Sequence, residues 1–393
     1  STTASGRWLR TWQRGDDAMT TLTFLDFFAG VGMAELALSP EWTCVWANDL
    51  DGRKAAVHAA NFGRGIYHVK DVEDVSASDL PDGAAMAWAS FPCQDLSLAG
   101  WRRGMSAGRS GAFWPFWRVM RDLFDAGRRP PLIVVENVAG LLYGPGFAGL
   151  CNALVALDMR FGALLIDADR FLPQSRPRVF IVAVDAALDV GALVEPNPAG
   201  SAWIPGSVAR AHAGLSAEAR ARWHWWRLPE PEAPPRPIEE VIEETPVGVT
   251  WQSGEETAQL IAMMSPVNLA KVERAKTRGA PAVGFVYKRT RDGRQRAEIR
   301  FDGVAGCLRT PYGGSSRQTV VILEGGVVRS RLLSPREAAR LMGLPDGFVL
   351  PPRYNDAYRA MGDGVAAPVV AWLGRHLLTP LAMMATERSR DKG

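Results

Sequence analysis

Cys93 is the first residue whose type and position point to chemistry. It directly follows a proline in the stretch WASFPCQDLSLAG at 88–100, after a small apolar run and before a loop rich in Gly, Ser and Arg. Such a cysteine is either a nucleophile or an inert part of the core, which is the commoner state of a buried cysteine. The other cysteines, at 44, 151 and 307, lie far apart with no CxxC pair, so we expect no disulfide framework and no metal site.

Two other short strings carry groups that could act on the same substrate. ENV at 136–138 places Glu136 at the end of the apolar run LIVVE, and QSRPR at 174–178 holds Arg176 and Arg178 before another apolar run. Each has an ordinary interpretation, because Glu136 could cap a helix and the arginines could form a surface pair. If the strings meet, they bring a thiol, a carboxyl group and two guanidinium groups to one place.

A series of strand, loop and helix patterns must position these groups. TLTFLDFFAG at 21–30 is an apolar run that ends in a glycine turn, and the helically spaced VGMAELALS follows it. Further apolar runs alternate with helical segments, which predicts an α/β fold with a doubly wound, mostly parallel sheet. Ligands bind such sheets at the carboxyl ends of the strands. The residues expected at those ends are Asp26, Gly30, Asp49, Asp71, Cys93 and Glu136.

The glycine loop FAGVG indicates what kind of cofactor fits there. It lacks the GxGxxG phosphate fingerprint, since Ala34 and Leu36 occupy the places where that pattern needs other residues. A nucleoside cofactor without phosphates, such as S-adenosylmethionine, fits better. Asp49, 17 residues after Gly32, is placed to meet ribose hydroxyls, and Asp71 is the candidate for the adenine edge. Alone, the glycines could equally serve close packing.

Taken together, DFFAGVG, FPCQ, ENV and QSRPR closely resemble the DNA cytosine-5 methyltransferase family in order and spacing throughout 22–185. The resemblance resumes at LLSPREAARLMGLPDGF (332–348), whose SPRE predicts a helix N-terminus, and at AYRAMGDGV (357–365). It implies a Rossmann-like methyltransferase domain and a smaller, irregular β-rich target-recognition domain. The expected division is an N-terminal extension at 1–19, a catalytic domain at 20–190 with 328–385, a recognition domain at 191–327 and a tail at 386–393.

The resemblance also implies the roles of the catalytic groups. Cytosine C5 is a poor nucleophile, so the family adds a thiolate, here Cys93, to C6 of the base. Arg178 would favour the thiolate, and Glu136 would hold or donate a proton at N3, which requires a carboxyl group whose pKa is raised by burial. Arg176 and Arg178 would also contact the base.

By the same resemblance, the donor S-adenosyl-L-methionine would contact a larger set of residues, and one of them departs from the family pattern. Gly362–Asp363–Gly364–Val365 stands where the family usually has Gly-Asn-Ser-Val. The change is either tolerated drift or a sign that the enzyme prefers a cationic analogue of the donor. The expected cofactor contacts are Asp26, Phe28, Gly30, Gly32, Asp49, Leu50, Asp71, Val72, Pro92, Phe113 and Asp363.

A paired cytosine must leave the duplex before its C6 can be attacked, so the family flips the base out. The segment 94–113 is long, polar and punctuated by glycines, which suits a lid over the flipped base, although an ordinary mobile loop has the same composition. Gln94 or Ser97 could fill the vacated stack. Phosphate contacts are expected from Arg102, Arg103 and Arg109.

The net charge of +3 hides two oppositely charged segments in the insert, which is the expected recognition domain at 191–327. Residues 229–256 hold eight glutamates against Arg236, which predicts an acidic, exposed linker. Residues 271–300 hold ten Lys or Arg, and YKRTRDGRQRAEIR suits a hairpin facing a polyanion, although a solvated basic face has the same pattern. Trp223, Trp225 and Trp226 are expected to pack in a core. The candidate DNA contacts are Lys288, Arg289, Arg291, Arg294, Arg309, Tyr312 and Gly313.

We therefore expect a cytoplasmic, nucleoid-associated monomer that acts on double-stranded DNA, with a cognate restriction endonuclease as a possible partner. No apolar run approaches the length of a membrane span. One alternative is a tRNA cytosine-5 methyltransferase, which shares the catalytic strings, but the insert lacks that branch's Cys-Phe-Thr signature. The other is a catalytically silent DNA-binding regulator, an alternative that Asp363 leaves open.

Overall fold

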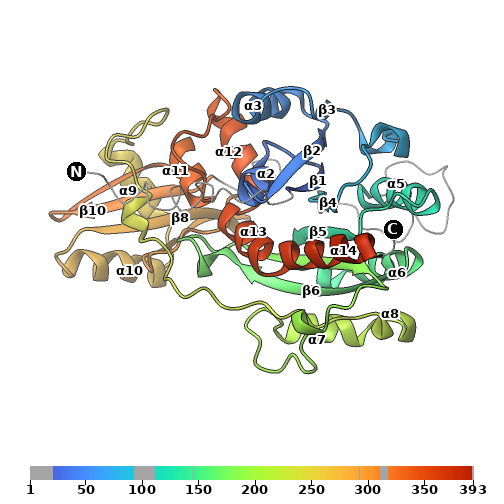
Figure 1. Ribbon diagram of the computed structural model, residues 1–393. Helices are drawn as coiled ribbons and strands as arrows, with labels where there is room; N and C mark the ends of the chain where they lie inside the picture. The colour runs from blue at the N-terminus through green and yellow to red at the C-terminus, as the bar shows by residue number, and fades with distance from the viewer. Residues whose placement is uncertain (1–20, 93–110, 145, 292, 310–316, 392–393) are drawn as a thin grey trace.

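The computed structural model describes residues 21–92, 111–144, 146–291, 293–309 and 317–391. Its larger sheet has seven strands in the order β3-β2-β1-β4-β5-β7-β6, in which β7 is antiparallel to both its neighbours and the other pairs are parallel. This confirms the predicted doubly wound sheet (Figure 1). The strands are β1 (Leu22–Phe27), β2 (Trp42–Asp49), β3 (Tyr67–Val69), β4 (Met86–Ala89), β5 (Leu132–Val138), β6 (Met159–Asp167) and β7 (Pro177–Asp185).

The central strands are apolar along their whole length because helices cover both faces of the sheet. Every residue of β4 is buried, and so are the first six residues of β5. The order of the strands reverses between β1 and β4, and this switch point is where ligands bind open α/β sheets. The helices around the sheet are α2 (Met33–Leu38), α3 (Gly52–Phe62), α5 (Phe113–Asp125), α6 (Gly146–Ala156), α12 (Tyr354–Asp363), α13 (Ala367–Leu373) and α14 (Thr379–Asp391).

The last helices return to the first part of the sheet. Helix α13 packs against α2, and the indole Nε1 of Trp42 in β2 donates to the hydroxyl of Thr379 at 2.9 Å. The stretch Tyr354–Arg390 has the length and apolar character of a membrane span, but 61% of its most apolar window is buried inside the molecule. It is therefore a core element, and Figure 1 shows α13 and α14 lying across the larger sheet.

Short single-turn helices connect many of these elements. The 3₁₀ turns are η2 (Val72–Asp74), η3 (Ala77–Asp79), η5 (Ala139–Tyr143), η6 (Ala168–Arg170), η7 (Gly191–Leu193) and η8 (Ile238–Glu240), and a π turn, η10 (Gly374–Leu378), joins α13 to α14.

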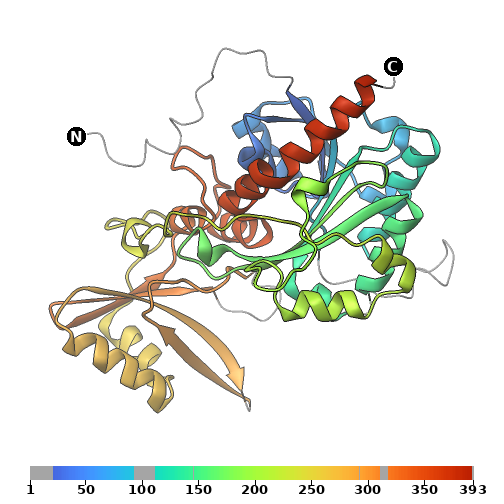
Figure 2. The same cartoon turned by 60° about the horizontal axis from the view of Figure 1, so that its bottom comes forward.

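The smaller sheet has four antiparallel strands in the order β11-β10-β8-β9. Helices α9 (Gly254–Ala262) and α10 (Pro266–Thr277) pack against it around a separate core that includes Leu260, Val272 and Ile299. Figure 2 shows the hairpin of β8 and β9 projecting away from the larger sheet. The predicted hairpin and the smaller β-rich unit are both confirmed. The strands are β8 (Ala282–Arg291), β9 (Arg294–Arg300), β10 (Thr319–Glu324) and β11 (Val327–Leu332).

The chain enters and leaves this smaller unit at neighbouring points. Trp251 forms a β-bridge with Arg331, and the backbone N–H of Gln252 donates to the carbonyl of Ser330 at 2.9 Å. Directly after β11, helix α11 (Pro335–Leu341) begins with the predicted capping box. The Ser334 hydroxyl accepts from the Glu337 N–H at 3.1 Å, and the Glu337 carboxylate accepts from the Ser334 N–H at 2.8 Å.

The first part of the insert packs on the larger sheet rather than on the smaller one. Helices α7 (Gly206–Ala213) and α8 (Ala217–Ala221) lead to Trp226, which is buried and donates from its indole to the Val182 carbonyl at 3.1 Å. Gly162 makes this close approach possible, because a Cβ there would lie 1.9 Å from the His224 carbonyl oxygen. The expected core position of the tryptophan cluster is thus confirmed, within the larger core.

The acidic segment 229–256 is only partly the exposed linker that its composition predicts. Most of its residues are exposed, but Ile238 and Val241 are buried in the larger core. The carboxylate of Glu243 accepts a hydrogen bond from the Ser334 hydroxyl at 2.5 Å. A free linker is therefore the wrong description of this segment, because apolar side chains within the acidic run fix it against the catalytic region.

Candidate active site

A cavity of about 1870 Å³ opens at the carboxyl ends of the strands, at the switch point between β1 and β4. Its walls come from both sheets, since Asp26 of β1 and Tyr287 of β8 both line it. The predicted residues that line it are Asp26, Phe28, Gly30, Asp49, Leu50, Asp71, Val72, Pro92, Glu136, Arg178, Lys288, Arg289, Arg309 and Asp363.

Other predicted residues are placed elsewhere or lie outside the described part of the chain. Gly32, Phe113, Arg176 and Arg294 are described but do not line the cavity. Arg291 belongs to β8, and a contact from its side chain to DNA stays a prediction. The predictions for the following residues lie outside the described residues: Cys93, Gln94, Ser97, Arg102, Arg103, Arg109, Tyr312 and Gly313.

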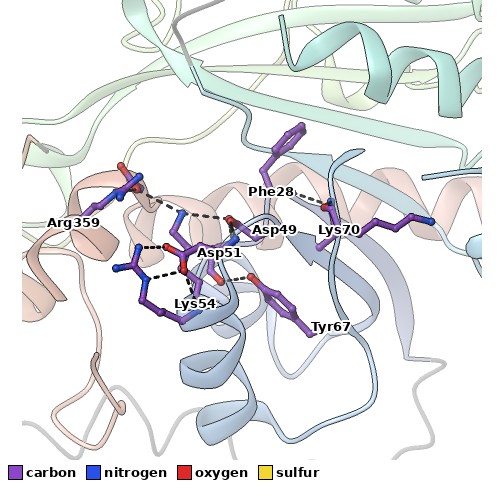
Figure 3. Close-up of polar contacts among 11 residues, drawn as sticks. Phe28, Asp49, Asp51, Lys54, Tyr67, Lys70 and Arg359 are labelled. Atoms are coloured by element: carbon purple, nitrogen blue, oxygen red, sulfur yellow. Dashed lines mark hydrogen bonds and ion pairs between the residues drawn. The ribbon is translucent and has the colours of Figure 1, made fainter. Parts of the chain in front are cut away.

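The turn after β1 is tied to the end of β2. Phe28 and Gly30 have φ values of 61° and 60°, in the left-handed region, so the chain reverses sharply here. The Phe28 N–H donates to the Asn48 side-chain oxygen at 3.3 Å, and the Gly30 N–H donates to Asp49 Oδ2 at 3.2 Å. The Tyr67 hydroxyl donates to the Gly30 carbonyl at 2.8 Å (Figure 3). These bonds hold the turn open toward the cavity.

Gly32 and Phe113 have packing functions in this structure. Gly32 has φ 85°, and a Cβ there would lie 2.4 Å from a ring carbon of Phe62, so the glycine lets the turn pack against α3. Phe113 is buried at the start of α5, with its ring centroid 5.6 Å from that of Phe91. Phe91 itself lines the cavity, so Phe113 supports a cavity wall from behind.

A chain of charges crosses the cavity from α3 to α12. Lys54 Nζ lies 3.3 Å from Asp49 Oδ2 and 3.6 Å from Asp363 Oδ2, and Arg359 Nε lies 3.6 Å from the same Asp363 oxygen (Figure 3). Asp49 also accepts from the Asp51 N–H at 3.0 Å. Sequence reasoning named both acids but missed Lys54 and Arg359. The signal was their spacing, because Lys54 lies in the first turn of the helix after Asp49 and Arg359 lies four residues before Asp363.

Asp26 is a buried acid at the end of β1, with 1% of its surface exposed. Burial raises its pKa well above the ordinary value, and the nearby Glu35 and Asp49 raise the pKa further. Its Oδ2 atom has no hydrogen-bond partner among the described residues. The negative surroundings of the glycine loop would repel a pyrophosphate, which supports the expectation of a cofactor without phosphates.

The Asp71 carboxylate already has a partner. One of its oxygens caps η2 by accepting from the Glu73 N–H at 3.0 Å, and Asp71 lines the cavity. The carbonyl of the preceding Lys70 accepts from the Asn48 amide at 3.0 Å. The loop after β3 is thus fixed against β2, and a contact from Asp71 to an adenine edge stays a prediction.

Glu136 and Arg178 meet across neighbouring strands in the wall of the cavity. Glu136 is buried near the carboxyl end of β5, and Arg178 Nε on β7 lies 3.1 Å from its Oε1. Burial raises the pKa of Glu136, although Arg178, Arg176 and a hydrogen bond from Ser90 oppose the rise. The expectation of a raised pKa is borne out, since the apolar strand behind the carboxyl group is the largest cause.

Arg176 has partners other than a base in this structure. Its side chain is almost fully buried, and Nη2 donates to the carbonyls of Gly362 at 2.7 Å and Gly364 at 2.6 Å. Nη1 donates to the Leu308 carbonyl at 3.4 Å. Burial lowers the pKa of Arg176 to about 10. The guanidinium group therefore joins three chain segments behind the cavity wall, and its expected contact with the base stays a prediction.

Cys307 is a second thiol in this region, and sequence reasoning assigned it no role. It lines the cavity, with Sγ 3.5 Å from Arg176 Nη1 and 4.0 Å from Arg178 Nη2. It lies 131 residues from Arg176 in the chain, so no local pattern could have linked them.

The basic residues of the hairpin occupy defined faces. Arg289 lies directly opposite Arg296, and Arg291 lies opposite Arg294, so these four positions share one face of the hairpin. Lys288 pairs with Ala297 and belongs to the alternate set, although it also lines the cavity. Arg296 was missed as a candidate, but the alternation of the strand includes it with the others.

Known proteins resemble this chain over most of its length. A sequence model described as C-5 cytosine-specific DNA methylase matches residues 22–379. Type II methyltransferase M.HhaI of Haemophilus parahaemolyticus is 27% identical over 368 residues, which cover 92% of this chain and 96% of that protein. Type II methyltransferase M.HpaII of Haemophilus parainfluenzae is 24% identical over 380 residues, covering 91% and 90%. The crystal structure of S. pombe Dnmt2 methyltransferase shares the fold, with a TM-score of 0.55 at 18% identity, covering 92% of this chain and 99% of that one.

Proposed function

The chain belongs to the C-5 cytosine-specific DNA methylase family, and from that premise we propose that it methylates C5 of a cytosine flipped out of double-stranded DNA. The proposal rests chiefly on the Glu136–Arg178 pair, which lines the cavity. Pro92, which precedes Cys93 in the sequence, lines the same cavity. A carboxyl group with a raised pKa beside a fixed guanidinium group suits protonation of a ring nitrogen while a thiolate adds elsewhere on the ring.

The residues at the β1 and β2 end of the cavity fit S-adenosylmethionine. Asp49 presents a carboxylate at the end of β2, the Phe28 side of the turn offers an apolar wall, and the acidic surroundings of the glycine loop disfavour a phosphate group. When bound, the donor supplies an electrophilic methyl group on a sulfonium ion. The chain's own task is to orient this methyl group toward C5 and to exclude water from it.

Ordinary S-adenosylmethionine is the donor that we propose, despite Asp363. Lys54 Nζ and Arg359 Nε both lie 3.6 Å from Asp363 Oδ2, so the negative charge of Asp363 is compensated within the site. The amino-acid end of the donor carries an ammonium and a carboxylate group. Asp363 is opposite in charge to the ammonium group, and Lys54 is opposite in charge to the carboxylate. This favours the drift interpretation over a cationic donor analogue. Profiling transferred groups with Asp363→Asn tests it, because a changed donor preference would restore the analogue hypothesis.

In the proposed reaction Cys93 adds to C6 of cytosine while Glu136 supplies a proton to N3. Arg178 holds the Glu136 carboxyl group at the correct edge of the base, and Arg176 keeps the surrounding turns in place. After methyl transfer the C5 proton leaves to a base that we do not assign, and Cys93 departs by elimination. Adduct formation and elimination leave the thiol unchanged, so each turnover consumes one donor and releases one proton.

We propose that residues 251–332 form the DNA-recognition unit, a smaller part of the expected 191–327 extended through β11. The separate core of the small sheet and the packing of the tryptophan segment on the larger sheet support this division. We also propose a cytoplasmic, nucleoid-associated monomer. The type II names of the relatives support a cognate restriction endonuclease as a partner.

Mass spectrometry of nucleosides from plasmid DNA tests the proposed reaction. Cells that express this chain should yield deoxycytidine heavier by one methyl group, and cells that express Cys93→Ala should not. Digested tRNA from the same cells separates the RNA alternative, which predicts the modified nucleoside in tRNA alone. Unmodified DNA and RNA, together with retained DNA binding, would support a silent regulator.

A further inference from the structure

In the hairpin of β8 and β9, the guanidinium group of Arg289 lies beside a tyrosine and a glutamate on the same face. On the face shared by Arg289 and Arg296, the next pair along the ladder is Tyr287 opposite Glu298. Glu298 is the one acidic residue on this face among the described residues of the hairpin. An acid on a surface that meets a polyanion weakens phosphate binding, so its position needs another explanation.

Three contacts around Glu298 supply that explanation. The Arg289 guanidinium carbon lies 4.9 Å from the centroid of the Tyr287 ring, a cation–π arrangement. Arg289 Nε lies 4.0 Å from Glu298 Oε2, and the Tyr287 hydroxyl hydrogen-bonds to the Glu298 side chain. Tyrosine and glutamate thus limit the conformations of the arginine. Because a flexible arginine side chain loses rotamer entropy when it binds, a guanidinium group whose conformations are already limited loses less entropy on binding.

A fixed guanidinium fork matches a base edge better than it matches a phosphate. Guanine presents O6 and N7 as two adjacent acceptors in the major groove, and a bidentate arginine is the commonest specific contact to them. Phosphates need only a cation that follows the backbone. Arg289 and Tyr287 line the cavity, whereas Arg296, directly across the ladder, is exposed and does not line it.

We propose that Arg289 reads a guanine of the target sequence in the major groove, with Tyr287 and Glu298 as its positioning residues and Arg296 as a phosphate contact. The inference depends on the proposed function only in requiring double-stranded DNA as the ligand. It adds a specificity-determining residue and the base that this residue recognises.

Selection of bound duplexes from a randomised library tests this without requiring methyl transfer. The wild-type chain is compared with the variants Arg289→Lys and Arg296→Lys. Both variants keep the positive charge, and they change opposite members of the same cross-strand pair. The wild type should select a motif containing guanine. Arg289→Lys should lose discrimination at one guanine position by about 5- to 150-fold, the contribution of one bidentate contact, while Arg296→Lys should select the same motif as the wild type.

A purely structural role for Arg289 predicts a different pattern. In that case Arg289→Lys would weaken binding to all duplexes equally and leave the motif unchanged, which would overturn the proposal. Replacing the guanine by 7-deazaguanine, which lacks N7, should weaken the wild type but not Arg289→Lys. Glu298→Gln should relax the same single position partially, and relaxation at any other position would contradict its positioning role.

The outcome of the nucleoside experiment is independent of this one. A chain that selects a guanine-containing motif but does not methylate DNA would leave the inference standing and remove the proposed reaction. A chain that methylates cytosine while Arg289→Lys keeps the complete motif would do the reverse.

Discussion

The buried charges of the catalytic region and the exposed charges of the hairpin use the same side chains for different purposes. Arg331, at the base of the small sheet, is fully buried and makes two contacts of 2.6 and 2.7 Å with the buried carboxylate of Glu337. Its guanidinium carbon also lies over the Trp251 ring, 5.0 Å from the ring centroid. Arg294 and Arg296, near the hairpin turn, are exposed. Burial makes an arginine a cross-link within the protein, whereas exposure leaves it available to a polyanion.

The same contrast applies to acids. Glu136, Asp26 and Glu337 are buried, and each depends on its surroundings for its protonation state or its partner. Removing a buried charge should therefore change activity or stability strongly, and removing an exposed one should change only binding to DNA.

Glu136→Gln should have the largest effect, a loss of about 100- to 10,000-fold in kcat, because it removes a positioned proton donor. Glu136 must be protonated to donate its proton, and its pKa is raised. The wild-type rate should therefore fall as pH rises through that pKa, because the carboxyl group loses its proton. The variant should lack this descending limb. Single-turnover methylation across pH 5–9 measures both effects, and an unchanged profile in the variant would assign the proton to another group.

Glu337→Gln should destabilise the protein by about 3–5 kcal/mol, because it leaves Arg331 buried without its counter-charge. Urea unfolding measures this change. The double variant Arg331→Met/Glu337→Leu is the control, since replacing both partners by apolar groups should recover part of the loss. The remainder is the cost of the Ser334 and Glu243 N–H groups, which lose their acceptor. A small effect of the single variant would mean that the junction between the sheets admits water.

Asp26→Asn should stabilise the protein progressively as pH rises. The folded-state pKa of Asp26 is raised, so the folded protein binds this proton more tightly than the unfolded chain. The free energy of unfolding of the wild type therefore falls as pH increases from about 4 through the raised pKa, whereas the variant lacks this contribution. Thermal melting at pH 4 and pH 8 measures the difference, which should be larger at pH 8. Equal differences at both pH values would contradict the raised pKa.

Arg294→Ala should have the smallest effect on the folded protein, within about 0.5 kcal/mol, because the residue is exposed. DNA affinity should nevertheless fall, and the slope of log K against log salt concentration should become shallower by about 1. Fluorescence anisotropy at several salt concentrations measures the slope. An unchanged slope would show that this end of the hairpin does not contact phosphate.

Local patterns predicted the elements that depend on local rules. The glycine turn after β1, the capping box at Ser334 and the pairing of β8 with β9 in a hairpin all follow from nearby residues. The end of β2 could likewise be placed at Asp49 because a buried strand ends where its apolar run ends.

Contacts between distant segments could not be predicted in this way. The bonds from Arg176 to Gly362 and Gly364 join residues almost 190 positions apart, and only the fold brings them together. Charge counting over 229–256 indicated an exposed linker because it gave no weight to the two apolar residues, Ile238 and Val241, that fix the segment.

The adjacent entry and exit of the small unit have an evolutionary consequence. The hydrogen bond from Gln252 to Ser330 holds the two ends of the segment 251–332 next to each other, where the segment joins the catalytic region. A different segment with the same end-to-end spacing could replace it at a small cost in chain entropy, even if its length differed considerably. On the proposed division of the chain, exchange of this one contiguous segment would change the recognised sequence, while the catalytic residues would be inherited unchanged.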